Sequence, residues 1–392
     1  MTRRLALLAP AVLIAACVHR VPAPEVTPPH RLGTTAPALT APGRKIAFAP
    51  IAIKSTPQGM ALTSLNDEEL FAYGTAALGR DDYLDAVTYF ERIADFFPKS
   101  EHRPQALYQA GIALEQLRDF AGAVERFTEA VQADGPETAP GIEARFRLAD
   151  AYYFLDENEA AAQVLEELGR DPAVSALEQA QANVKRGIVL FSEGKLDDSE
   201  ALLTKTLAFI QQNLADEVSD EYLPSQAEFY VAEIYRQHFL DAKLDPAKST
   251  KEELLDDLEY KAQMLLSAQG HYLRCIRLGH PEWATASGFR IGELYEKMYE
   301  QMVDASLPSG LDSEAADMYR EQLKSRVRVL VDKAIDAYEQ TLAAAERVGA
   351  TNPFIAETRV ELNRMKTLLL QEDASAKSAP IKPAAPAPKS SS

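Results

Sequence analysis

Cysteine, tryptophan and histidine are scarce in this chain of 392 residues, which has two cysteines, one tryptophan and six histidines. With only Cys17 and Cys275, the chain cannot form the framework of several disulfides that is typical of small secreted domains. The same scarcity excludes a zinc site built from paired cysteines. The apolar stretch from Leu5 to Ala16 has about 12 residues, whereas a membrane-spanning helix needs roughly 20, so this stretch is too short to span a bilayer.

Catalytic motifs are missing as well. The sequence contains no G-x-S-x-G elbow, no phosphate-binding glycine loop and no H-E-x-x-H zinc motif. Its histidines stand singly, and Cys275 and Trp283 are expected to pack in the core. We therefore predict a protein that is not an enzyme, with no cofactor, no metal and no small-molecule substrate. The alternative is a peptidoglycan-acting enzyme or an activator of one, although the compact domain with a Glu-Ser setting that lytic transglycosylases need is absent.

The charge balance narrows the class of partner. The chain has 41 basic and 59 acidic residues, a formal net charge of −18, and both of its ends are basic. The acidic groups therefore lie in the body between the ends. Nucleic-acid binding depends on clustered lysines and arginines, so an acidic body argues against it.

The N-terminal stretch has the parts of a secretory signal peptide: the basic start "MTRR", a short apolar region and small residues before Cys17. The sequence "LIAAC" at residues 13–17 resembles the lipobox of bacterial lipoproteins. The resemblance implies that residues 1–16 are removed and that Cys17 carries diacylglycerol and an amide-linked acyl chain such as palmitate. Several acyl chains give stable membrane anchoring. Val18 after the cysteine is similar to an outer-membrane address, so we expect an envelope lipoprotein facing the periplasm.

Two further segments are predicted to lack a fold. Residues 17–66 are rich in proline and form a tether in which "KIAFAPIAI" is the apolar patch, and residues 373–392 form a low-complexity tail.

The body between them is a repeat. Small residues recur at Ala86, Ala123, Ala161 and Ser199, a period of 37 or 38 residues. An apolar residue follows each of them by four positions, as in Phe90, and a glycine or alanine precedes it on an earlier helix, as in Gly74. Such a period predicts stacked helix pairs in which small residues let the two backbones approach closely.

This skeleton of small, small, aromatic and proline positions resembles the tetratricopeptide repeat, although the period exceeds the usual 34 residues. It implies an all-α solenoid with four repeats over residues 67–211. Residues 212–372 would form extended pairs with long second helices, from about Glu252 to Leu278 and from about Ser313 to Arg347, closed by a capping helix that starts at Pro353. We place a soft boundary near residue 212.

In arrays of this family the first helix of each pair lines the concave side, and the resemblance implies a groove there. The repeat register gives its residues as Tyr108, Ile112, Phe146, Asp150, Tyr153, Val184 and Ile188. An apolar groove of this kind suits an extended or helical segment of another protein. The lysine and asparagine set that holds a C-terminal carboxylate is missing, which disfavours a chaperone-tail clamp. The alternative is that several of these side chains pack against the next repeat.

Lipobox and repeats together are similar in layout to the barrel-assembly lipoproteins and to the periplasmic tetratricopeptide partners of the Tol–Pal system. The extended C-terminal pairs are similar, more loosely, to repeat lipoproteins of the myxobacterial gliding machinery. These resemblances imply a non-catalytic scaffold that docks other envelope proteins. They do not identify the partner, the pathway or the oligomeric state.

The lipobox yields a direct prediction. Cys17→Ala should abolish acylation and release the protein from membranes, because the lipid is attached to this thiol. Fractionation of cells that express the variant, with metabolic labelling by a palmitate analogue, measures both effects. Equal membrane retention of the two proteins would count against the anchor.

Overall fold

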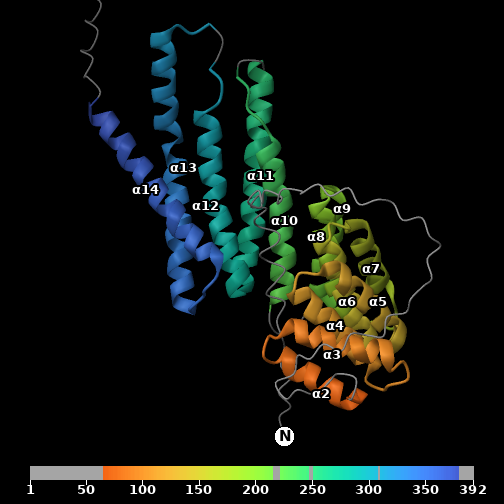
Figure 1. Ribbon diagram of the computed structural model, residues 1–392. Coiled ribbons are helices and arrows are strands. Elements are labelled where there is room, and N and C mark those ends of the chain that lie inside the picture. Colours follow the sequence, from red (N-terminus) through yellow and green to blue (C-terminus); the bar gives the residue numbers. More distant parts are fainter. Residues whose placement is uncertain (1–64, 215–220, 247–249, 308–309, 379–392) are drawn as a thin grey trace, which may run out of the picture. The chain divides into compact units, whose positions relative to one another are not determined.

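A computed structural model describes residues 65–214, 221–246, 250–307 and 310–378, and all the regular elements within these ranges are α-helices (Figure 1). The all-α, tetratricopeptide-type solenoid class predicted from the sequence is confirmed. The predicted signal peptide, Cys17, the tether apart from its last two residues, and most of the tail lie outside the described residues. Among the described helices, none is both long and apolar enough to cross a bilayer.

The chain divides between Leu117 and Arg118 into two compact units, and the boundary predicted near residue 212 falls inside the second. The first unit holds α2 (Asp67–Leu78), α3 (Tyr83–Phe96) and α4 (Arg103–Gln116). The second unit begins with α5 (Phe120–Asp134), α6 (Ala139–Phe154), α7 (Asn158–Arg170), α8 (Ala176–Ser192) and α9 (Leu196–Asn213). It continues with α10 (Tyr222–Asp241), α11 (Lys251–Leu278), α12 (Pro281–Val303), α13 (Ser313–Val348) and α14 (Pro353–Ser378). Within each unit, helices that follow one another in the chain pack side by side.

Helix starts are encoded locally. At α2, the Asn66 side chain accepts a hydrogen bond from the Glu69 amide, and the Glu69 carboxylate accepts one from the Asn66 amide. The same reciprocal capping box opens α8 at Ser175 and α11 at Thr250. Because the first amides of a helix have no partner within it, each box fixes where its helix begins.

The turns inside the helix pairs repeat with the same period as the sequence. Asp81, Arg118, Asp156 and Gly194 all have left-handed backbone conformations, with φ between 61° and 76°. In the turns at Asp81, Asp156 and Gly194, the amide of the next residue donates to a carbonyl five residues earlier, at 2.9 to 3.0 Å. This pattern ends the first helix and reverses the chain. Only Gly194 adopts the conformation without a steric cost from a β-carbon.

The two helices of a pair approach through a glycine. A β-carbon at Gly74 would lie 2.7 Å from Cε1 of Phe90, and one at Gly187 would lie 2.5 Å from Cδ2 of Leu203. The predicted contact between first-helix glycine and second-helix apolar residue is therefore confirmed in both pairs. The repeated small residues Ala86, Ala123, Ala161 and Ser199 are fully buried.

The C-terminal pairs have longer helices (green to blue in Figure 1), and α12 and α13 keep the glycine contact. The long second helices were predicted to within one residue at each end, as α11 and α13, and the closing helix is α14. Gly292 of α12 faces Tyr338 of α13, and a β-carbon at Gly292 would lie only 2.2 Å from Cε1 of that ring. Tyr338 is fully buried, and its hydroxyl donates to Glu296 at 3.0 Å.

Lys261 of α11 closes the end of α10. Its side chain is fully buried, its ammonium donates to the carbonyls of Phe239 and Ala242, and it lies 4.3 Å from the centre of the Phe239 ring. The last carbonyls of a helix lack partners within it, so this lysine supplies two of the missing hydrogen bonds.

Gly292→Ala should lower the free energy of unfolding by about 1–3 kcal/mol, because the added methyl group meets a buried ring that cannot move away. Gly270 is the matched control: it lies in α11, and a β-carbon there meets only an arginine side chain, at 3.8 Å. Gly270→Ala should raise stability by about 0.5–1 kcal/mol through helix propensity. Urea unfolding of both variants measures the difference, and equal stabilities would contradict the predicted register.

Lys261 makes the free energy of unfolding depend on pH. Burial lowers the pKa of Lys261 to about 8 from its ordinary 10.5, with Asp241 acting in the opposite direction. Between these values the unfolded chain binds more protons than the folded chain, so this group makes the free energy of unfolding rise with pH across that window. Lys261→Met removes the contribution. The stability difference between wild type and variant should therefore grow in favour of wild type as the pH is raised from 8.

Urea titrations across this range test the slope, with the exposed Lys205→Met as the control. A stability difference for Lys261→Met that stays flat with pH would show that the buried lysine keeps its ordinary pKa.

Candidate interaction surface

The predicted site residues fall into three groups. Cys17, the predicted lipid site, is outside the described residues. Tyr108 and Ile112 lie one turn apart on α4 in the first unit and are both half-buried. The other five predicted residues belong to α6 and α8 of the second unit.

In the second unit, most of these side chains are packed inside the protein. Val184 and Ile188 on α8 are 0% and 3% exposed, and Phe146 on α6 is 7% exposed. The reason is that α8 is covered by α7, α9 and α10, so its inward face meets other helices rather than solvent. For these three residues the structure follows the alternative left open by the sequence, packing against the neighbouring repeats. Tyr153 is half-buried and packs against the apolar cluster that contains Phe146.

Asp150, predicted as a polar contact for a bound segment, already has a partner. The Lys185 ammonium of α8 donates to its two carboxylate oxygens, at 2.7 and 2.9 Å. Arg145 on α6 makes a second ionic link, donating to Asp171 at 2.9 Å. The Lys185–Asp150 ion pair links two successive helix pairs, whereas the Arg145–Asp171 ion pair links α6 to the end of α7 within one pair. The groove therefore stays a prediction at Tyr108, Ile112 and Tyr153.

A buried ionic cluster joins α10, α11 and α12. Arg290 donates to Glu293 at 2.7 Å, with its Nε 3.1 Å from Glu233, and Arg236 lies 3.0 Å from Glu293. Tyr272 donates to Glu233 as well. Burial by itself would raise the pKa of Glu293, but Arg290 and Arg236 outweigh it and hold that pKa below its usual value. The Glu293 carboxylate and the two guanidinium groups thus stay charged, and this arrangement makes the junction between pairs rigid rather than reactive.

Metal and nucleophile chemistry finds no support in the described part of the chain. Among the described residues, no three or more histidine, cysteine or acidic side chains gather so that they could hold a metal ion. Cys275 is fully buried, and burial raises the pKa of its thiol to about 12, so it is protonated at neutral pH. His271 pairs with Glu228 at 2.7 Å and stacks on Tyr235.

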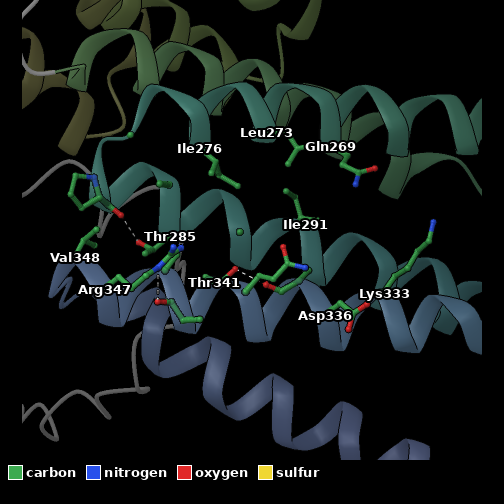
Figure 2. Close-up of a pocket in the computed structure, with 18 of the residues that line it drawn as sticks. Gln269, Leu273, Ile276, Thr285, Ile291, Lys333, Asp336, Thr341, Arg347 and Val348 are labelled. Carbon is green, nitrogen blue, oxygen red and sulfur yellow. Dashed lines mark hydrogen bonds between the residues drawn. The ribbon is translucent and has the colours of Figure 1, made fainter.

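A groove that sequence reasoning missed runs between α11 and α13, with α12 as its floor (Figure 2). Its volume is about 1050 Å³. Leu273 and Ile276 line the α11 side, and Ala337 and Ala344 line the α13 side. The walls are the second helices of two successive pairs, whereas the predicted groove used first helices.

The two ends of this groove differ. At one end the Tyr295 hydroxyl donates to Gln269 at 3.0 Å, and the Lys333 ammonium lies 5.0 Å from the centre of the Tyr295 ring. The other end is bordered by Pro281, at the start of α12, and by Arg347. Figure 2 shows Lys333 and Arg347 at opposite ends of α13's lining face.

Only part of this groove was visible in the sequence. The small residues Ala284, Gly288 and Gly292 follow one another at intervals of four on α12 and so share one face of it, but no groove was predicted from this spacing. A β-carbon at Gly288 would lie 2.2 Å from the hydroxyl oxygen of Thr341. The small residues of α12 therefore bring α12 close to α13, and they place few side-chain atoms on the floor of the groove.

Comparison with known proteins identifies the repeat type. Residues 143–172, which cover most of α6 and α7, match the family model of the tetratricopeptide repeat. No curated protein matches the chain. Helix pairs of this type generally serve as non-catalytic surfaces for protein partners.

Solved structures give weak overall likenesses. The MamA protein is 18% identical, with 51% of this chain and 91% of MamA covered and a TM-score of 0.35. A thermophilic tetratricopeptide protein of Thermus thermophilus is 20% identical over 55% of this chain and 92% of its own, with a TM-score of 0.32. A tetratricopeptide repeat protein of Parabacteroides merdae is 14% identical over 76% and 98%, with a TM-score of 0.35. Likenesses at this level transfer no partner or activity to this chain.

Proposed function

We propose that this protein is a non-catalytic scaffold that binds other proteins of a bacterial envelope. The observation that carries the proposal is the series of tetratricopeptide-type helix pairs, with the repeat match at residues 143–172. Repeats that contact mainly their neighbours bury one continuous core and leave long helical faces, and such faces suit extended or helical segments of partners.

The envelope location rests on the lipobox-like sequence that ends at Cys17. In this proposal the lipid holds the chain at the outer membrane, the proline-rich tether spaces the folded body from the bilayer, and the body faces the periplasm. Its partners would belong to an envelope assembly system or to a trans-envelope machine such as a gliding apparatus.

Crosslinking of the full chain in native envelopes, followed by identification of captured proteins, tests this function. The scaffold proposal expects a small, reproducible set of envelope proteins that depends on the folded body. Purified body incubated with peptidoglycan should release no muropeptides. Muropeptide release, with no reproducible partner, would favour the peptidoglycan-acting alternative.

Tyr108 and Ile112 provide the mutational prediction for the first unit. Replacing both with serine should abolish partner capture and leave helical content nearly unchanged, because both side chains are half-buried rather than core. Truncating a tyrosine anchor costs about 2 kcal/mol of binding or more. Quantitative crosslinking and circular dichroism measure the two effects.

Leu84 and Phe96 on α3 provide the matched control, since they are 71% and 51% exposed in the same unit. Leu84→Ser with Phe96→Ser should retain capture. Loss of capture in both double variants would mean that the response is not specific to α4. Unfolding of the Tyr108 and Ile112 variant would place these residues in the core.

A further inference from the structure

The groove between α11 and α13 has the form of a seat for one more helix. Consecutive helices α11, α12 and α13 run antiparallel, so the two walls run parallel to each other on either side of α12 (Figures 1 and 2). Leu273 on one wall is 43% exposed, and Val348 at the end of the other is 60% exposed. Apolar side chains therefore remain in contact with solvent along a concave face.

The floor is shaped to receive side chains. Ala284, Gly288 and Ile291 are spaced by four and three residues on α12, which puts them in one row along the groove. Thr341 of α13 already packs at Gly288, so Ala284 and Ile291 are the apolar floor residues that the ridge of an incoming helix would meet.

The two ends of the groove each carry a basic side chain, whereas the protein as a whole is acidic. Lys333 and Arg347 are both exposed, and their separation of 14 positions on α13 corresponds to roughly 21 Å. The start of α12 at Pro281 adds the positive end of a helix dipole beside Arg347, and Glu282 in the same first turn opposes it. Asp336 lies one turn from Lys333 and weakens the positive potential at that end.

We propose that this groove binds an amphipathic helix of a partner protein that carries an apolar stripe and an acidic side chain near each end. The apolar stripe lies on the α12 floor, and the two acids meet Lys333 and Arg347. This assignment rests on the proposed protein-binding function and names the class of segment that it recognises.

The charges of the groove also favour an acidic partner helix over the chain's own apolar patch. Residues 45–53, "KIAFAPIAI", have Arg44 before them, begin with Lys45 and are followed by Lys54. Docking this patch would bring basic side chains toward Lys333 and Arg347, where like charges oppose binding.

The test uses the full chain and a synthetic helix of about 20 residues with a leucine stripe and two glutamates about 14 positions apart. Two matched peptides carry lysines in place of the glutamates, or serines in place of the leucines. Binding is followed by fluorescence anisotropy. The glutamate peptide should bind at least about tenfold more tightly than either control peptide, and its binding should weaken as salt is added.

Substitutions in the chain test which groove residues contact the peptide. Leu273→Asp should weaken the glutamate peptide about tenfold or more, and Val360→Asp, at an exposed site on α14, should not. Reversing both cations, Lys333→Glu with Arg347→Glu, should reverse the preference so that the lysine peptide binds more tightly. Arg320→Glu, on α13 outside the groove lining, is the control for charge alone. Asp336→Asn should tighten the glutamate peptide.

Several results would overturn the proposal. One is an unchanged peptide preference after charge reversal in a folded double variant. A second is a dimer that the glutamate peptide competes away in sedimentation, which would assign the groove to a second copy. A third is tighter peptide binding when Ile46, Phe48, Ile51 and Ile53 are changed to serine, which would assign it to the chain's own patch. Partner capture in native envelopes that survives any of these results leaves the scaffold function standing without this groove.

Discussion

The close approach of paired helices through a glycine is the constraint on which the rest of the structure depends. At Gly292, the absence of a β-carbon lets α12 lie against the ring of Tyr338, and the same contact recurs at Gly74 and Gly187. In the N-terminal part of the array, left-handed turns at Asp81, Arg118, Asp156 and Gly194 recur at intervals of 37 or 38 residues. A large apolar or aromatic side chain is thus buried beside a glycine at three places along the chain, namely Phe90, Leu203 and Tyr338.

The contacts between successive helix pairs differ from the glycine contact within a pair. Charged groups that are mostly buried join them, as with Lys185 and Asp150 between α6 and α8 and with Arg290, Glu233 and Glu293 between α10 and α12. Such groups are stable inside the protein only when paired, so they fix register between pairs more strictly than apolar contacts would. The rigid junction between α10 and α12 in turn holds the floor of the groove in place.

The residues predicted to line a binding groove and the residues that line the groove between α11 and α13 differ in burial. Val184 and Ile188 were predicted to line a groove and are buried, whereas the walls around Leu273 and Val348 were not singled out and are exposed. In the proposed groove, second helices as well as first helices would meet a partner. Lys333 and Arg347, at its two ends, would then favour helical segments with acidic ends.

The sequence by itself determined the helix pairs, their period, the long helices α11 and α13 to within one residue at each end, and the glycine contacts. These features depend on residues within one pair, namely caps, small residues and apolar spacing. Only the tertiary structure decided which apolar side chains meet solvent, because burial of Val184 depends on α7, α9 and α10, and exposure of Leu273 depends on how α12 and α13 pack. The periodicity of one helix marks its apolar face, but the neighbouring pairs determine how much of that face they cover.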